Sequence, residues 1–483
     1  MQKIKLIFIL VSIFMLSGTT GLAQQLMTLD EYLARVEKTN PGIKALDLSI
    51  ESAGQKILEM DMVYSPLLSG GYNYSDDKSG GGLGSALATK ELVANAWNIG
   101  LSKKFQFGSQ VTFGYNSSRA RFNLLSPADV FDTGDISVFT GYDMKPFLQI
   151  EQSLLRDFNS GLTKAGIKKA KAAVLAGEYM LRYQRQQILL GARVAYWNVS
   201  LGREVAAFRK LSLERTAKLL NWVQKRVDLD LAEESDLLQA QAGYKLRQLN
   251  LLQAQEDEIK ASRDFNQMLG LSAETAEVDL EKLSDKISAY GGVDKLTKSG
   301  QRTDVLSAKA TYESSQFAEE ETKYRARPEV SLSGVYSLHG LGLTQSDSWD
   351  QVTNSEKPFY SLGISLIVPL DYKTLNKVKE GYKKDFLAAK ESLNKAELAA
   401  QKDWEALNSA WNSVKAQLKL AQEIKDIQER RVQKEQAKLE KGRSTTFAVL
   451  TAENDLDDAA LNVYRLVFEE LATSAQAELY STR

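Results

Sequence analysis

The sequence has no cysteine and only one histidine in 483 residues. Without cysteine there are no disulfide bonds, no thiolate metal sites and no lipid-modified N-terminal cysteine. The single histidine, His339, lies in the glycine-rich stretch HGLGLT, where a surface position is commoner than a metal-ligand role. We therefore expect no metal site and no cofactor.

The sequence also has no large excess of positive or negative charge, because 61 basic residues balance 62 acidic residues and leave a net charge of −1. This balance gives no general attraction to nucleic acid or to anionic lipid. The sequence lacks the patterns GxxxxGK[ST] and HExxH, and GGGLG at residues 80–84 has no βαβ unit around it. We expect that the protein has no nucleic-acid partner and that it is not an enzyme. We therefore assign no catalytic residue.

Long apolar runs are confined to the N-terminus. Residues 6–16 are mostly apolar, follow Lys3 and Lys5, and precede small residues before Gln24. This order predicts a secretory signal peptide over residues 1–23, with a buried core segment as the alternative. No later run of about 20 apolar residues exists, so the exported chain is predicted to have no helix that crosses a bilayer.

Proline is scarce and unevenly placed. None of the seven prolines lies in residues 147–327 or 370–483. Because proline inside a helix costs about 3 kcal/mol, these blocks are free to form long helices, which we predict over 162–227 and 374–441. Apolar residues in the second block step by three and four, as in a coiled-coil seam. They are Trp404, Leu407, Trp411, Val414, Leu418 and Ala421. A plain soluble coiled coil is the alternative interpretation of this block.

The two helical blocks end in breaks that match each other 212 residues apart, at about 226–236 and 438–447. We call these breaks the first tip and the second tip. The match predicts one duplication, with a first repeat over 24–270, a linker over 271–295 and a second repeat over 296–483. Solenoid repeats are far shorter than this unit.

Short segments of alternating polarity occur in both halves. PLLSGGYNYS, from Pro66, is echoed by PEVSLSGVYS, from Pro328. We predict strands at about 67–75 and 329–338, with partner strands at 96–107 and 359–368. Pro66, Pro328 and Pro369 are predicted to lie at the turns between helices and strands. A period of two over about ten residues is typical of a membrane β-strand, and a half-buried soluble sheet is the alternative.

Two features favour the membrane interpretation. Aromatic residues suited to a membrane interface recur in these strands, namely Tyr72, Tyr74, Trp97, Tyr336 and Tyr360. The segments 76–95 and 338–358 are long, rich in Gly, Ser and Asp, and lack periodicity, as extracellular barrel loops do. Two strand pairs cannot close a barrel, and lipid does not tolerate an open sheet edge, so several chains are predicted to share one barrel.

The sequence resembles the TolC-type outer-membrane efflux protein family along nearly the whole mature chain. The resemblance rests on LMTLDEYLARVEKTNPGIKAL (26–46), the prolines before both strand regions, SLLRD (153–157), VPLDY (368–372) and the duplicated order of these motifs. It implies a mainly α protein with membrane β structure. In such a homotrimer each chain gives four strands to a 12-stranded β-barrel in outer-membrane lipid, and long helices form a periplasmic α-barrel.

The resemblance also implies a passive exit duct of an efflux or secretion system, whose tips meet a periplasmic adaptor and, through it, an inner-membrane transporter. The predicted tip residues are Asp228, Asp230, Glu233, Glu234, Asp236, Gly442, Arg443 and Ser444. The first tip has Asp230 where the family often has glycine, and Ala448 and Thr451 are neutral at positions that can be acidic. The alternative is a solvated acidic loop in which Ser235 and Asp236 cap a helix.

Residues 109–154 are extra material relative to the family pattern. They predict a hairpin after Gly108, at 109–117, and a further segment at 147–155. Six membrane strands in each chain are one possibility, but we favour four strands plus an elaborated hairpin. Two rival functions remain at this point. A trimeric coiled-coil adhesin would explain the seam but not the strand pairs, and a porin would explain the strands but not the helices.

Overall fold

The computed structural model describes residues 26–79, 89–124, 138–273, 276, 278–289 and 295–481. The predicted signal peptide and the GGGLG stretch lie outside the described residues. The chain forms two compact units. The helical unit comprises Met1–Ile50, Tyr179–Leu306 and Ala396–Arg483, and the sheet unit comprises Glu51–Glu178 and Ser307–Lys395. Each unit therefore draws on both sequence repeats.

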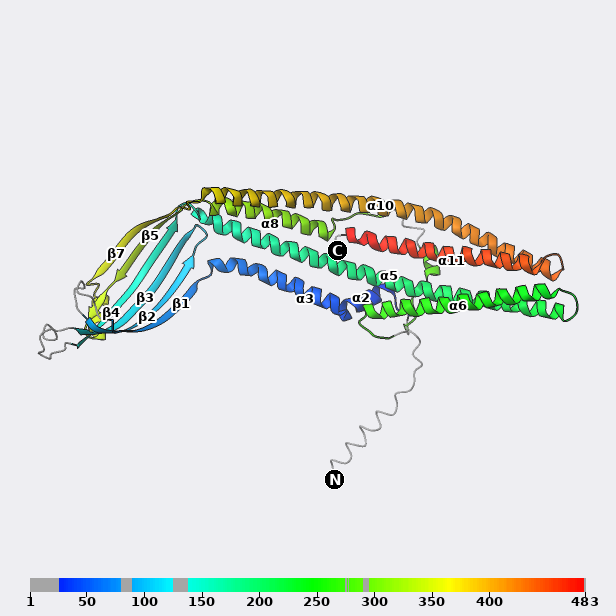
Figure 1. The fold of residues 1–483 in the computed structure, drawn as a ribbon, viewed down its shortest axis with the longest axis horizontal. Coiled ribbons are helices and arrows are strands. Elements are labelled where there is room, and N and C mark those ends of the chain that lie inside the picture. The colour runs from blue at the N-terminus through cyan, green and yellow to red at the C-terminus, as the bar shows by residue number, and fades with distance from the viewer. Residues whose placement is uncertain are drawn as a thin grey trace, which may run out of the picture. The chain divides into compact units, whose positions relative to one another are not determined.

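The helical unit is built from long helices (Figure 1). It contains α2 (Leu29–Thr39), α6 (Glu234–Met268), α7 (Leu283–Ala289), α11 (Thr446–Ala477) and η4 (Glu478–Tyr480), with parts of α3 (Pro41–Lys56), α5 (Gly161–Val227), α8 (Thr303–Arg325) and α10 (Tyr372–Glu440). The bounds of α5 and α10 confirm the two long helices predicted from the missing prolines. None of the helices in the described part of the chain combines the length and the apolar character needed to cross a bilayer.

The core of the helical unit joins the start of the chain to its middle. The rings of Tyr32 and Phe265 stack at 4.2 Å, and the Tyr32 hydroxyl donates to the Phe265 carbonyl over 2.9 Å. The Tyr196 hydroxyl donates to the Met27 carbonyl over 2.7 Å. The predicted seam of α10 also faces inward, because Trp411, Val414, Leu418 and Ala421 are all buried. Burial of this stripe stabilises the long helix, which propensity alone would not do.

The sheet unit contains one antiparallel sheet in the order β1-β2-β3-β4-β5-β7, with β6 paired to β4. Its strands are β1 (Leu67–Asp77), β2 (Thr89–Lys104), β3 (Ser109–Leu124), β4 (Val138–Ser153), β5 (Glu329–Leu338), β6 (Gly340–Gly342) and β7 (Pro358–Ile367). The 3-10 helices η1 (Ile57–Tyr64) and η2 (Phe158–Ser160) lie next to it in sequence. Pro66 directly precedes β1, Pro328 directly precedes β5, and Pro369 lies between β7 and α10, as predicted.

The preference for four strands plus a hairpin is wrong. β3 and β4 each have 16 residues and are central strands of the sheet, so the described chain has six long strands (Figure 1). Gly108 makes the tight β2–β3 turn possible at a φ of 92°, and a Cβ there would lie 2.7 Å from the Asp157 carbonyl oxygen. In the second half of β3, SSRARFNL, the apolar residues Ala120, Phe122 and Leu124 lie on the opposite face from Phe113 and Tyr115. The alternation therefore changes phase within β3, which is why the sequence pattern underestimated its length.

The segment 338–358, which we predicted to be a long loop without periodicity, contains regular secondary structure. It contains β6 and a short helix, α9 (Gln345–Thr353). The Thr344 side chain caps this helix by accepting a hydrogen bond from the Asp347 amide over 3.2 Å. The Trp349 ring packs edge-on against Tyr115 of β3, with ring centroids 5.7 Å apart. The predicted loop 76–95 is shorter than expected, because β1 continues to Asp77 and β2 begins at Thr89.

Candidate functional site

The first and second tips lie at the same end of the helical unit (Figure 1). The first joins α5 to α6, and the second joins α10 to α11. The two hairpins touch where Leu450 of α11 packs against Gly243 of α6, since a Cβ on Gly243 would lie 3.0 Å from the Leu450 side chain. The duplicated breaks in the sequence are therefore neighbours in the structure.

Both tips close with the same backbone geometry. In the first, the Leu231 amide donates to the Arg226 carbonyl over 2.7 Å, and in the second, the Arg443 amide donates to the Lys438 carbonyl over 2.8 Å. The residue before each donor has a positive φ, 56° at Asp230 and 71° at Gly442. This is the Schellman closure of a helix, which requires a left-handed residue. Asp230 is one of the few residue types that accept this conformation in place of glycine.

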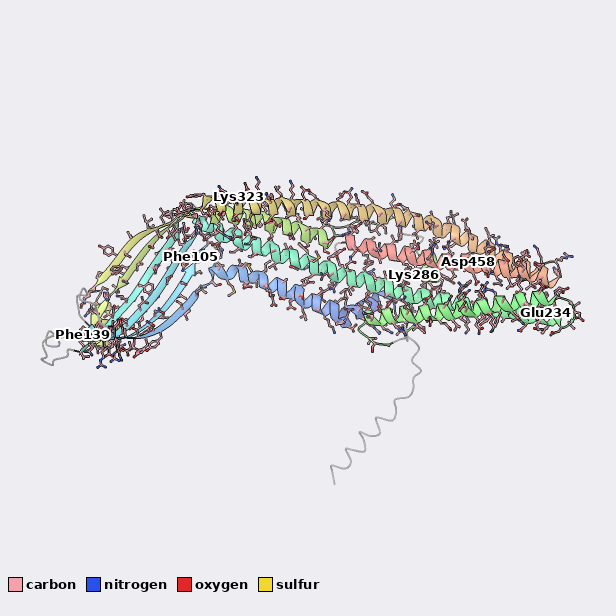
Figure 2. The ribbon with its side chains drawn as sticks, viewed as in Figure 1. Phe105, Phe139, Glu234, Lys286, Lys323 and Asp458 are labelled. Carbon is pink, nitrogen blue, oxygen red and sulfur yellow. The ribbon has the colours of Figure 1, made fainter. Side chains whose placement is uncertain are left out.

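The predicted acidic side chains gather at the first tip. Asp228, Asp230, Glu233 and Glu234 are exposed and Asp236 is half-buried. Figure 2 shows Glu234 at the end of α6 nearest the turn. The Asp228 carboxylate accepts a hydrogen bond from the Gln224 amide over 2.8 Å.

The N-cap of α6 is Glu233, through its backbone alone, so neither Ser235 nor Asp236 caps the helix. Glu234 and Asp236 lie in the first turn, where carboxylates favour the positive end of the helix dipole. The suggested capping role for this loop is therefore wrong in its details, although the exposed position of the carboxylates agrees with it.

The second tip is basic where the first is acidic, with exposed Lys441 and Arg443 beside Lys438. The Ser444 hydroxyl and the Lys438 ammonium each donate to the Glu435 carboxylate over 2.7 Å. These hydrogen bonds, that of Lys438 first, hold the pKa of Glu435 below its usual value. The Thr445 hydroxyl caps α11 by accepting from the Ala448 amide over 3.2 Å.

Three exposed apolar side chains at the tips were not predicted from the sequence. Leu229, Leu231 and Phe447 are each at least 60% exposed. The alternation Asp-Leu-Asp-Leu at 228–231 was the available signal, but we had interpreted only its charges. Exposed apolar side chains surrounded by charge are typical of a surface that contacts another protein.

A group of charged and polar side chains surrounds the buried carboxylates of Glu453 and Asp457 behind the tips, and we call it the buried charge cluster. It consists of Arg209, Ser212 and Arg215 of α5, Arg247 of α6, Gln436 of α10, and Glu453 and Asp457 of α11. All four long helices of the two hairpins therefore contribute a side chain. No sequence pattern indicated this cluster, because its members lie up to 248 residues apart.

Asp457 is the centre of the buried charge cluster, with 2% of its side chain exposed. It accepts from Arg209 over 3.0 Å and from Ser212 over 3.0 Å, and Arg247 lies 3.4 Å away. Arg215 bridges the two acids, at 2.9 Å from Glu453 and 3.5 Å from Asp457. Burial raises the pKa of Glu453, and its pair with Arg215 opposes that rise.

The sheet has two chemically different faces through the middle of its strands. Leu68, Tyr72, Trp97, Ile99, Leu101, Phe113, Tyr115, Leu148, Ile150, Leu332, Tyr336, Tyr360, Leu362, Ile364 and Leu366 share the apolar face by their register. Ser69, Gly71, Asn73, Asn98, Gly100, Ser102, Thr112, Asn116, Gln149, Ser333, Ser361, Gly363 and Ser365 share the polar face. The five predicted aromatics all lie on the apolar face, which agrees with the predicted alternation.

The motifs SLLRD and VPLDY each contain an aspartate that lies just before the next helix. Asp157 accepts from the Thr163 amide and from the Lys104 ammonium, over 3.0 and 2.7 Å. Asp371 accepts from the Thr374 amide over 3.0 Å. Within the described residues, no group of three or more acidic or histidine side chains is placed to hold a metal ion.

Comparison with known proteins gives a consistent result. Residues 299–481 match the family model of the outer membrane efflux protein. The chain is 24% identical over 385 residues to outer membrane efflux protein BepC of Brucella suis, covering 74% of this chain and 73% of BepC.

Two solved structures have the same fold. The outer-membrane channel OprN matches with a TM-score of 0.65 at 15% identity, over 94% of this chain and 89% of OprN. The outer membrane protein VceC of Vibrio cholerae matches with a TM-score of 0.65 at 14% identity, over 94% of both chains.

Proposed function

This chain belongs to the TolC-type outer-membrane efflux protein family, and from that premise we propose that it is the exit duct of a tripartite export system. Its place is the outer membrane, with a helical extension into the periplasm. In the proposed assembly three copies form the duct, a periplasmic adaptor meets the tips, and an inner-membrane transporter supplies the energy.

One observation carries the proposal, which is the apolar face of the sheet. Leu362 is 83% exposed and Tyr360 is 80% exposed, and their neighbours on that face are also apolar. A contiguous exposed apolar surface of this size is not stable in water, whereas it matches the hydrocarbon of a membrane. The opposite face carries small polar residues, which suit a water-filled lumen. The sheet thus supports conduction, and the family supports its use for efflux.

The two tips are the proposed contact with the adaptor and the entrance of the duct. Five carboxylates at the first tip would become fifteen around a threefold axis, which would favour cations at the mouth. Leu229, Leu231 and Phe447 would supply apolar contacts to the adaptor, because each is exposed at the turn.

Single-channel recording in planar bilayers tests conduction. Purified protein is expected to give stable steps with a preference for cations. A variant with the five acids changed to Asn or Gln is expected to lose that preference, whereas changing Lys441 and Arg443 to Gln is the control with the opposite charge. An unchanged cation preference in the first variant would remove the role of the acidic tip. Folded, inserted protein that never conducts would refute the duct itself.

Cross-linking tests the adaptor contact. The absence of cysteine allows one thiol to be introduced at Leu229 or at Ser444 without background. We expect a covalent product with a single periplasmic protein from Leu229→Cys and none from a matched exposed position far from the turn, Leu398→Cys. Equal labelling from both positions would contradict a contact centred on the tips.

A further inference from the structure

The two edges of the sheet have no partner among the residues that the structure describes. β1 is one edge and β7 is the other, and every described residue of both strands is exposed. Each edge presents a row of backbone amides and carbonyls, and such groups cannot remain unpaired in hydrocarbon. The apolar residues on both strands place these edges at membrane depth. The edges must therefore pair with β-structure outside the chain, and a second copy offers the matching edge.

The alternation of side chains restricts how the two edges can pair. On both strands the even-numbered residues lie on the apolar face, as Tyr72 and Leu362 do. Paired residues in a sheet share a face, and a slip of one residue would bring polar side chains to the lipid. An even-numbered residue of β1 must therefore lie opposite an even-numbered residue of β7.

The ends of the strands fix the remaining choice. Pro66 directly precedes β1, and β7 ends at Ile367 just before Pro369, so both ends leave the sheet on the same side. Aligning these ends puts Leu67 opposite Ile367 and gives all ten residues of β7 a partner. Polar Ser69 then lies opposite Ser365, and apolar Tyr72 lies opposite Leu362.

We propose that β1 of one copy pairs antiparallel with β7 of the next copy in this register, so that three copies close a barrel of eighteen strands. The number of copies rests on the proposed function, but the six strands of each chain and the pairing edges come from the fold. The resemblance to the family had implied twelve strands, and the full-length β3 and β4 account for the difference.

The geometry of the closed barrel supports this register. Following the paired residue from each strand to the next, a line across the sheet that starts at Leu67 in β1 ends at Ser361 in β7. In the proposed register Ser361 meets Asn73 of the next copy, six residues beyond Leu67 after six strands. This is one residue of shear per strand, the ratio that tilts the strands of an eight-stranded, shear-eight barrel by about 36°. Membrane barrels have tilts of about 35–45°.

The two nearest registers that keep the polarity of the faces are shifted by two residues in either direction. Pairing Leu67 with Ser365 reduces the shear to four residues per chain and the tilt to about 26°, which is too small. Pairing Ser69 with Ile367 leaves both Leu67 and Leu68 without a partner in β7, because that strand ends at Ile367. At a strand spacing of about 4.8 Å, the proposed barrel is about 34 Å across its backbone, against about 23 Å for twelve strands at the same tilt.

Disulfide formation between introduced cysteines tests the proposal in the otherwise cysteine-free full-length chain. Ser365 lies in β7, with Ser331 of its own chain on one side and, in the proposed register, Ser69 of the next copy on the other. Oxidation of the S69C/S365C variant is expected to link chains into species of two and three, and no more than three. The S331C/S365C variant is the matched control, which is expected to form a bond within each chain.

A slipped variant, S69C/S361C, places the thiols four residues out of register, too far for a disulfide. It is expected to give no linked chains. Linking in this variant, or none in S69C/S365C while S331C/S365C oxidises normally, would overturn the register. Products that stop at two chains would overturn the eighteen-stranded barrel. Conductance is measured on the same samples, so linked trimers that do not conduct would refute the duct while leaving the barrel intact.

Discussion

Replacing Asp457 by asparagine tests how much the buried charge cluster stabilises the paired hairpins. The asparagine side chain keeps the volume of the aspartate, so the change removes charge without opening a cavity. The guanidinium groups of Arg209, Arg215 and Arg247 lie 3.0, 3.5 and 3.4 Å from the Asp457 carboxylate. With that carboxylate neutral, only Glu453 remains to balance three positive charges, of which Arg247 is buried and Arg209 and Arg215 are partly buried.

The magnitude follows from burial. Removing one partner of a buried ion pair costs about 3–5 kcal/mol, because a desolvated charge is left uncompensated. Since about 1.4 kcal/mol is a factor of ten, local opening should become about 100-fold to 4,000-fold more frequent. Asp455 is the control, two residues away on α11, because its pair with Arg431 is 39% and 45% exposed. Such a surface pair contributes about 1 kcal/mol or less, which limits the change to about fivefold.

Hydrogen exchange followed by mass spectrometry measures both variants in detergent. Peptides from α6 and α11 are expected to exchange much faster in Asp457→Asn than in Asp455→Asn, whereas peptides from the sheet remain unchanged. Similar exchange in the two variants would show that the cluster stabilises the hairpins no more than a surface pair does. The explanation that burial makes the ion pairs of the buried charge cluster strongly stabilising would then be wrong.

Three further predictions concern the turns and the sheet. Gly442→Ala should lower the melting temperature and Asp230→Gly should raise it, each by the equivalent of about 1 kcal/mol, because both positions have a positive φ; shifts of equal sign would contradict this. Leu362→Arg should reduce the outer-membrane yield strongly, by about 2–4 kcal/mol of insertion energy, whereas Ser361→Arg on the polar face should not, and equal yields would refute the assignment of the faces. Burial would raise the pKa of Asp157, but hydrogen bonds from Lys104 and Thr163 outweigh it and lower that pKa. Its folded pKa is therefore below the unfolded value, so its contribution is full above about pH 4 and is lost as the pH falls. Asp157→Asn should melt lower than the native chain at pH 7, and the gap should narrow steadily as the pH falls below about 4; a gap that does not change there would show that the charge is not its source.

Much of the fold followed from local rules. The missing prolines predicted α5 and α10 to within two residues at each end. The spacing of Trp411, Val414 and Leu418 predicted which face of α10 is buried. The alternation in both strand regions predicted the apolar face, because side-chain direction in a strand depends on residue parity alone.

The residues of the candidate site could be predicted only where a run of charged residues or a glycine marks them in the local sequence. The acids of the first tip could be seen as a run, and Gly442 could be seen as a helix stop. The apolar residues Leu229 and Leu231 were also visible, but nothing local distinguishes an exposed leucine in a turn from a buried one. Their exposure depends on how the two hairpins lie against each other.

The sequence by itself determined the long helices, the alternating strands and the duplicated turns, because each depends on the spacing of neighbouring residues. Only the tertiary structure decided the number of strands, since the pairing of β3 with β4 continues through the residues where the alternation of β3 changes phase. It alone also assembled the buried charge cluster, because Asp457 meets Arg209 through the packing of helices that are distant in the chain. Contacts of that kind follow from the fold as a whole, and no local pattern records them.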